Sequence, residues 1–250
     1  MNTQEEYADL TTQTTPMRTY LYWPTHDEHA HGRYPGLLLY SEIFQQTGPI
    51  KRAALQFASQ GYVVAVPEIY HDREPPGTVL AYDQEGSDKG NLYKYETPLV
   101  TFDNDARSVL SHLGTHPACS GRLGVVGFCI GGHLAFRAAF NSEVEATCCF
   151  YATDIHTDSL GAAKKSDSLK RMSDINGEIM MVWGRQDPHV PDDGRFLVYQ
   201  TIRASGANFT WHEFNAVHAF MRDEGPRYNP TLARVCYGLA FETFERVLKN

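Results

Sequence analysis

Short apolar runs alternate with segments of helical periodicity along the chain. Residues 62–67 and 123–128 are almost continuously apolar, as expected of strands buried on both faces of a sheet. We predict strands over 18–23, 35–40, 62–67, 123–128, 146–151, 179–183 and 209–214. Helices are predicted over 48–60, 98–113, 133–140, 192–205 and 230–248. This alternation predicts an α/β fold with a mostly parallel central sheet and helices on both faces.

The length of the chain, 250 residues, fits a single α/β domain over 1–250. We expect residues 1–16 to form a loosely ordered N-terminal segment. Two stretches, 69–97 and 153–177, show no clear periodicity. The first follows the carboxyl end of a predicted strand, where ligands bind in open α/β sheets. It is therefore a candidate lid or pocket wall, although a surface excursion without a role would have the same composition.

Composition and charge narrow the class of protein. The net charge is −8 and no basic cluster stands out, which argues against a nucleic-acid partner. No apolar run approaches the roughly 18 residues that span a bilayer, and the polar, acidic start of the chain is unlike a secretory signal. The five cysteines are scattered and odd in number, which favours a reducing compartment. We expect a cytoplasmic protein, a monomer or weak homodimer, with no membrane partner.

The segment Gly127-Phe128-Cys129-Ile130-Gly131-Gly132 carries the strongest chemical signal. It lies between a predicted buried strand and a predicted helix. A strand, a sharp turn and a helix with a reactive residue at the tip form a nucleophile elbow, in which small flanking residues leave room for the strained turn. Serine is usual at the tip, whereas this chain has Cys129. A small buried cysteine is the alternative, but the glycine-flanked turn favours a nucleophile.

A nucleophile needs a base, and the base needs an acid that orients it. In this fold class the acid and then the histidine follow the nucleophile, each in a loop after a later strand. Asp187 follows one predicted strand and His218 follows the next. We therefore predict a triad of Cys129, His218 and Asp187. His189 and Asp154 are weaker alternatives, because each comes one strand too early for its role.

Backbone N–H groups are expected to stabilise the oxyanion of the reaction. We predict that Ile130, directly after the nucleophile, supplies one of them. Ile43, in the loop after the strand predicted over 35–40, is our choice for the other. Glu42 beside it is unusual, since an acid there would lie close to the thiol.

Five motifs together resemble those of the dienelactone hydrolase family, the carboxymethylenebutenolidases of the α/β-hydrolase fold. They are Glu42-Ile43-Phe44, Pro67-Glu68-Ile69-Tyr70, Gly127-Phe128-Cys129-Ile130-Gly131-Gly132, Gly184-Arg185-Gln186-Asp187 and His218-Ala219-Phe220-Met221-Arg222. They occur in family order from near residue 35 to 222, so the resemblance covers most of the chain. It implies a hydrolase that cleaves a lactone or a carboxylic ester.

The resemblance also implies a role for each matching residue. Cys129 would be the nucleophile, His218 its base and Asp187 the partner of the base. The residue matching Glu42 would help to deprotonate a neutral resting thiol when an anionic substrate enters, which limits oxidation of the thiolate. Arg222 matches a family arginine that binds the substrate carboxylate, a natural bidentate partner.

The chain departs from the family pattern at three positions near the expected pocket. A second family arginine that binds the carboxylate aligns with Lys89, and lysine lacks the planar fork of arginine. A solvated surface lysine is the alternative reading of that position. Gln45 stands where the family commonly has glycine, and Ser41 precedes the first motif. These residues could reshape the pocket, so the substrate could differ from the type lactone of the family.

Three kinds of function remain open on the sequence alone. A cysteine-dependent hydrolase, acting on an anionic dienelactone-like substrate or an unrelated small ester, uses all the predicted residues. A non-catalytic small-molecule binder on a hydrolase scaffold would need no triad. A thiol redox sensor would use Cys129 or the adjacent Cys148 and Cys149, but neighbouring strand residues point to opposite faces. His29 and His31 are too few ligands for a metal site, and we predict no metal and no organic cofactor.

Overall fold

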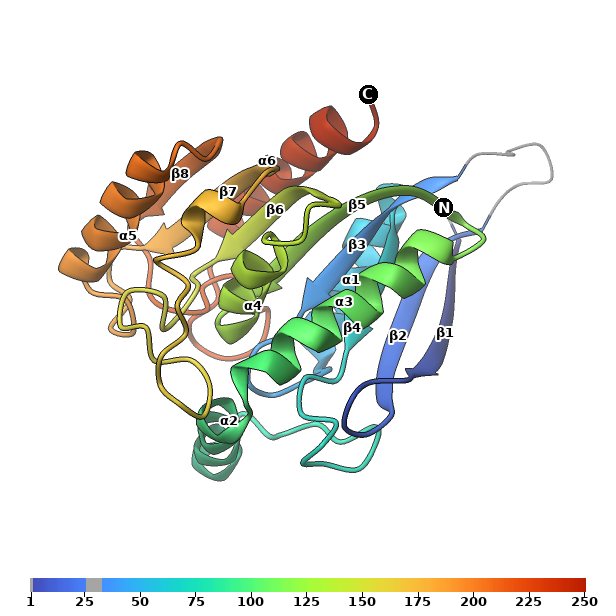
Figure 1. Ribbon diagram of the computed structural model, residues 1–250, viewed down its shortest axis with the longest axis horizontal. Helices are drawn as coiled ribbons and strands as arrows, with labels where there is room; N and C mark the ends of the chain where they lie inside the picture. The colour runs from blue at the N-terminus through green and yellow to red at the C-terminus, as the bar shows by residue number, and fades with distance from the viewer. Residues whose placement is uncertain (1, 26–32) are drawn as a thin grey trace.

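The computed structural model describes residues 2–25 and 33–250, which fold around one eight-stranded sheet (Figure 1). The strands are β1 Thr3–Leu10, β2 Met17–Pro24, β3 Tyr34–Tyr40, β4 Val63–Pro67, β5 Cys119–Phe128, β6 Val144–Phe150, β7 Glu178–Gly184 and β8 Phe209–Phe214. Their spatial order is β1-β2-β4-β3-β5-β6-β7-β8. The strands from β3 to β8 are parallel, and β2 is antiparallel to both of its neighbours. The predicted α/β fold class is confirmed.

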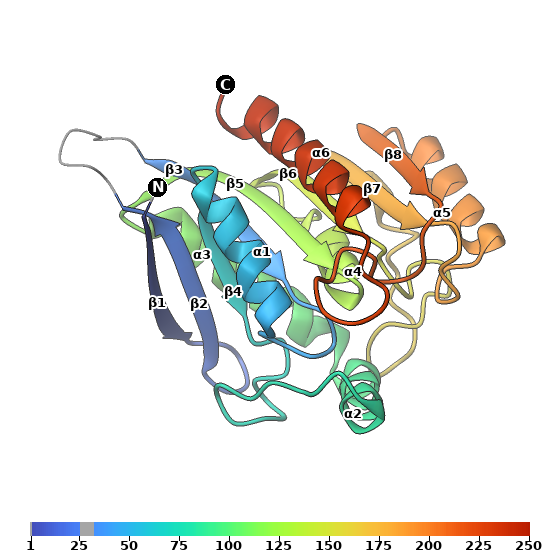
Figure 2. The same ribbon diagram turned by 180° about the vertical axis from the view of Figure 1, so that it is seen from behind.

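Helices cover both faces of the sheet, and each face has its own apolar core. The helices are α1 Gly48–Ser59, α2 Gln84–Glu96, α3 Leu99–Thr115, α4 Ile130–Ala138, α5 Asp192–Ser205 and α6 Pro230–Leu248, with a short 3-10 helix at Met172–Asp174. α1 and α6 lie on one face and α3, α4 and α5 on the other (Figures 1 and 2). Cys148 packs in the first core and Cys149 in the second, as expected for neighbouring strand residues.

Each element predicted from periodicity is present, with ends that differ by a few residues. The helix predicted over 133–140 already begins at Ile130, directly after the elbow. The strand predicted over 123–128 begins at Cys119. The last two helices and the last strand have the predicted bounds.

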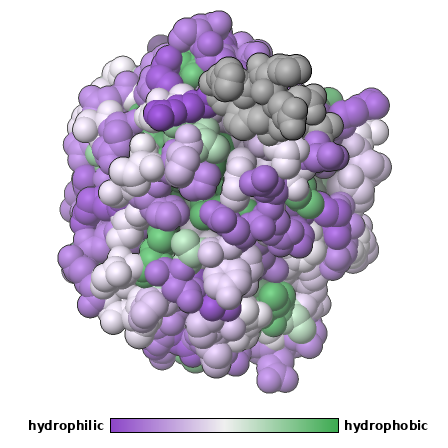
Figure 3. Space-filling view, turned by 90° about the vertical axis from the view of Figure 1, so that its right-hand side faces the viewer, coloured by the Kyte–Doolittle hydropathy of each residue, from purple (hydrophilic) through white to green (hydrophobic). Residues whose placement is uncertain are grey.

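The N-terminal segment is more ordered than we predicted from the sequence. Thr3–Leu10 forms β1, which pairs with β2 along its whole length. Arg18 contacts Asp9 across this pair with 2.9 Å between Nε and the carboxylate. Most β1 side chains are exposed, so the strand lacks the apolar pattern that would have revealed it. The side of the molecule on which this hairpin lies is largely hydrophilic at its surface, with a few scattered apolar residues (Figure 3).

The stretch 69–97 contains α2, a helix that periodicity did not predict. α2 buries only Gly86, Gly90 and Lys94, so it has no apolar stripe. It lies beyond the carboxyl ends of the parallel strands, below the sheet in both ribbon views (Figures 1 and 2). This position places it over the edge where the candidate catalytic residues gather.

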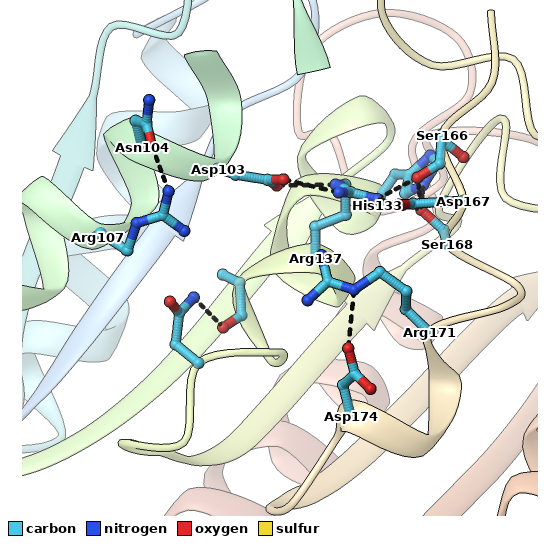
Figure 4. A network of polar contacts seen from close by, with 12 residues as sticks. Asp103, Asn104, Arg107, His133, Arg137, Ser166, Asp167, Ser168, Arg171 and Asp174 are labelled. Atoms are coloured by element: carbon cyan, nitrogen blue, oxygen red, sulfur yellow. Dashed lines mark hydrogen bonds and ion pairs between the residues drawn. The ribbon is translucent and has the colours of Figure 1, made fainter. Parts of the chain in front are cut away.

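The stretch 153–177 is largely irregular and is held by polar contacts (Figure 4). Arg137 of α4 lies at their centre, with Nη2 2.7 Å from Asp103 of α3 and Nη1 2.8 Å from Asp167. The same Nη1 donates to the Ser168 hydroxyl at 3.0 Å. Because Arg137 is almost completely buried, these contacts fix the irregular stretch against α4, the helix that follows Cys129.

Candidate active site

The turn after β5 holds Cys129 at a φ of +62° and a ψ of −122°, a strained conformation for a residue with a side chain. A Cβ at Gly127 would lie 1.9 Å from the carbonyl oxygen of Gly131. A Cβ at Gly131 would lie 2.3 Å from that of Ser41. Neither position accepts a larger residue, which explains the glycines of the motif. The turn predicted from the sequence is present, with Cys129 at its tip.

Asp187 and His218 meet in the loops after β7 and β8. Nδ1 of His218 lies 2.6 Å from Oδ2 of Asp187, whose other oxygen accepts the N–H of His189 at 2.8 Å. Arg195 holds this loop by donating to the carbonyl of Val190 at 2.7 Å. Since Asp187 engages Nδ1, the other ring nitrogen of His218 is left for the thiol.

His218 is a stronger base than an ordinary histidine. Burial by itself lowers its pKa, but the charge that Cys129 carries as a thiolate and the hydrogen bonds with Asp187 and Cys129 outweigh that effect and raise the pKa to about 10. The rings of Tyr151 and His189 pack edge-on against His218, with centroids at 5.2 and 4.6 Å. These rings limit the rotation of the imidazole.

The two predicted oxyanion donors flank the nucleophile. Ile130 is the first residue of α4, so its N–H has no acceptor within the helix. Ile43 belongs to the loop after β3, which packs directly on the elbow at Gly131, and it lines the same cavity as Cys129. Ile130 thus follows the nucleophile directly, and Ile43 shares its cavity.

α2 packs on the loop that carries Ile43 through Gly90. A Cβ at Gly90 would lie 2.5 Å from the carbonyl oxygen of Ile43. We expect Gly90→Ala to displace Ile43 and lower kcat about tenfold, because small misplacements of groups at the reaction centre slow catalysis strongly. Gly114→Ala on α3 is the matched control, since a Cβ there meets nothing within 4 Å. Steady-state kinetics compares the two variants, and equal kcat values would contradict this expectation.

Glu42 and Arg222 form an ion pair, with 3.5 Å between Oε2 and Nη1. The Arg222 guanidinium also lies over the Tyr82 ring, 4.3 Å from its centroid. Burial raises the pKa of the Glu42 carboxyl. The positive charges of Arg222 and His218 lower it, but by less, so the pKa stays above its usual value. The carboxylate form of such a group accepts a proton more readily than the carboxylate of an exposed glutamate with an ordinary pKa.

One cavity of about 470 Å³ lies at the carboxyl ends of the strands. Its lining residues are Glu42, Ile43, Phe44, Tyr82, Asp83, Gln84, Ser87, Asn91, Lys94, Cys129, Thr153, His189, His218, Arg222, Pro226 and Arg227. Gln84, Ser87, Asn91 and Lys94 follow one another on one side of α2 and form a wall of the cavity. The expectation that 69–97 supplies a pocket wall is thereby confirmed.

Comparison with known proteins identifies the relatives of this fold and site. The sequence profile of the dienelactone hydrolase family matches residues 17–248. The chain belongs to this family. A putative carboxymethylenebutenolidase of Saccharomyces cerevisiae is 41% identical to it over 98% of this chain and 92% of its own length. The carboxymethylenebutenolidase of Pseudomonas sp. strain P51 is 27% identical over 87% of each chain.

A solved structure agrees with this assignment at the level of the fold. The crystal structure of a putative dienelactone hydrolase from Klebsiella pneumoniae superposes with a TM-score of 0.84 at 23% identity, over 98% of this chain and 99% of that one. The fold is that of the α/β-hydrolases, and this member of the dienelactone hydrolase family is an enzyme that hydrolyses lactones or esters.

The structure of this family member does not bring Lys89 to the cavity. Its Nζ lies 2.5 Å from Glu74, and 43% of its side chain is exposed. Two cations that we did not predict line the cavity instead, Lys94 and Arg227. Lys94 follows Lys89 by five positions on α2 and so points to a different side of the helix. Among the described residues Arg227 has no ion-pair partner, and it lies in a loop that no sequence pattern distinguishes.

Gln45, one of the departures expected near the pocket, has a backbone conformation with a positive φ. Its φ is +65°, which glycine adopts without strain. The buried side chain accepts the N–H of Tyr70 at 3.2 Å and donates to the carbonyl of Thr78 at 3.1 Å. Gln45 therefore fastens the loop after β3 to the stretch before α2. Ser41 is buried as well, and its hydroxyl has no hydrogen-bond partner within the described part of the chain.

The weaker alternatives for the triad have other contacts. His189 packs on the ring of His218 and lines the cavity. Asp154 forms an ion pair with Lys94 at 2.9 Å. Residues 2–25 and 33–250 contain no cluster of three or more metal-ligating side chains, and His29 and His31 lie outside them. None of the described helices combines the length and the apolar character needed to cross a membrane.

Proposed function

We propose that the protein hydrolyses an anionic, dienelactone-like lactone by a Cys-His-Asp mechanism. One observation carries this proposal: the nucleophile Cys129, its base His218 and the carboxylate-binding Arg222 line a single cavity large enough for a small molecule. We expect the enzyme to act in the cytoplasm as a monomer or weak homodimer. The mechanism needs no cofactor, and we expect no nucleic-acid or membrane partner.

The first half of the reaction forms a thioester. His218 takes the proton of the Cys129 thiol, and Asp187 stabilises the resulting imidazolium. The sulfur attacks the lactone carbonyl carbon, and the N–H groups of Ile43 and Ile130 hold the oxyanion. The ring C–O bond then breaks, and the departing enolate oxygen takes the proton from the imidazolium.

The second half releases the acyl group. Neutral His218 removes a proton from a water molecule, and the hydroxide attacks the thioester carbonyl. The same backbone N–H groups hold the second oxyanion. The carbon–sulfur bond breaks, the acid leaves, and the sulfur recovers its proton from His218.

Glu42 and Arg222 make this cycle depend on an anionic substrate. The carboxylate of the substrate binds the Arg222 guanidinium through two hydrogen bonds and takes the place of Glu42. The released Glu42 then assists the deprotonation of Cys129. The oxidisable thiolate is consequently formed when substrate is present.

The decisive comparison uses a carboxylated lactone and its neutral methyl ester. We expect Arg222→Met to lower kcat/KM for the carboxylated lactone by about 10- to 100-fold, the value of a charge-assisted hydrogen-bonded pair. The neutral ester should be affected little. Arg185→Met is the matched control, because Arg185 is 64% exposed and lies outside the cavity lining. A wild-type enzyme without preference for the anion would contradict the proposal, and so would equal losses on both substrates.

A further inference from the structure

A second buried ion pair lies beside the nucleophile and has no part in the mechanism above. Nζ of Lys94 lies 2.9 Å from Oδ2 of Asp154, and the side chains are only 7% and 10% exposed. The other oxygen of Asp154 accepts hydrogen bonds from the hydroxyls of Tyr95 and Ser159, each at 3.1 Å. Asp154 is thus held from three directions and in turn fixes the Lys94 ammonium.

The pair joins the wall of the cavity to the backbone of the elbow. Lys94 is the last residue of the α2 wall and lines the cavity together with Cys129. Asp154 directly follows Thr153, whose N–H donates to the carbonyl of Cys129 at 3.3 Å. The ammonium is therefore held close to the turn that carries the thiol.

Stability alone is a weak reason for this arrangement. When two charged groups are buried, they lose hydration free energy, and their mutual attraction scarcely recovers it. Two apolar side chains of similar size often stabilise a fold as well as a buried ion pair does, or better. Burial lowers the pKa of Lys94, but the charge of Asp154 and its hydrogen bond to the ammonium outweigh this and raise the pKa, so the side chain stays protonated. A fixed positive charge beside a thiol favours the thiolate over the thiol.

We propose that Lys94, held by Asp154, is a positioning residue that stabilises the thiolate of Cys129. Its ammonium takes no proton and forms no bond during the reaction. It lowers the free energy of the state in which the thiol proton has moved to His218. This inference rests on the proposed role of Cys129 as nucleophile.

The test is the pH dependence of alkylation of Cys129 by iodoacetamide. Cys119, Cys148, Cys149 and Cys236 are buried, so Cys129 should dominate the reaction, and Cys129→Ala gives the background rate. We expect Lys94→Met to raise the midpoint of alkylation by about one pH unit, since it removes a nearby positive charge. kcat should fall about tenfold near neutral pH and recover at higher pH. Lys94→Arg, which retains the charge, should restore the midpoint to within a few tenths of a unit.

Two further variants separate electrostatics from structure. Lys89→Met removes a lysine of the same helix that pairs with Glu74 outside the cavity, and it should leave the midpoint unchanged. Lys94→Met leaves the buried Asp154 carboxylate unpaired, which could prevent folding. The double variant Lys94→Met with Asp154→Asn removes both charges and serves in its place if the single variant does not fold. A folded single or double variant with the wild-type midpoint would overturn the proposal.

The outcome can be told apart from a failure of the proposed function. If Cys129→Ala abolishes turnover while the Lys94 variants keep the wild-type alkylation profile, the nucleophile is correct and the role of Lys94 is wrong. If Cys129→Ala retains turnover, the proposed mechanism itself fails, whatever the alkylation profile.

Discussion

Replacing Cys129 with alanine is expected to lower kcat/KM for lactone hydrolysis by about 10⁴-fold or more, because no other nucleophile can take its place at the elbow. The amides of Ile43 and Ile130, which we propose as oxyanion donors, and the binding cavity remain in this variant. Any residual rate should therefore reflect water attacking a substrate that is bound and polarised. Initial rates with saturating and limiting lactone measure the loss, and mass spectrometry of wild-type enzyme mixed with substrate should detect the acyl group on Cys129.

Cys236→Ala is the matched control for the loss of a sulfur atom. Cys236, on α6, is completely buried in the core that this helix covers, and it does not line the cavity. This variant is expected to lose about 1 kcal/mol of stability or somewhat more and to keep its activity. If Cys129→Ala turned over substrate at the rate of Cys236→Ala, the thiol would have no part in the chemistry.

The elbow, the acid and the histidine could be placed from the sequence because their positions follow from chain order. Cys129, Asp187 and His218 come one, three and four residues after the parallel strands β5, β7 and β8. The carboxyl ends of parallel strands meet at one edge of the sheet. Residues far apart in the chain therefore meet without any knowledge of side-chain packing. The glycines around Cys129 also allowed the sharp turn to be predicted, because only small residues fit there.

The wall of the cavity could not be placed in this way. α2 is anchored by the close approach of Gly90 to Ile43 and by the ion pair of Lys94, and neither contact leaves an apolar period in the sequence. Which lysine faces the cavity depends on the helical register, so Lys89 could not be distinguished from Lys94 before the helix was located. β1 escaped prediction for a related reason, since an edge strand with polar side chains lacks an apolar face.

Asp187→Asn is expected to lower kcat/KM by about 10⁴-fold with little change in the fold. The carboxylate accepts the Nδ1 proton of His218, whereas a carboxamide can donate to Nδ1 instead. The ring would then carry its proton on Nε2 and could no longer accept the thiol proton of Cys129. Asp193→Asn, which changes an exposed carboxylate at the start of α5, is the matched control. Comparable kcat/KM values for the two variants would remove Asp187 from the mechanism.

The same substitution should remove a pH-dependent part of the stability. Although burial lowers the pKa of His218, Cys129 and Asp187 raise it from 6.5 to about 10 in the folded protein. Because the folded state binds this proton more tightly than the unfolded chain, the stabilisation is complete below about pH 6.5 and is lost as the pH rises through about 10. The difference in Tm between the wild type and Asp187→Asn should therefore be larger at about pH 6 than at about pH 10. A constant difference across that range would mean that Asp187 does not stabilise the imidazolium.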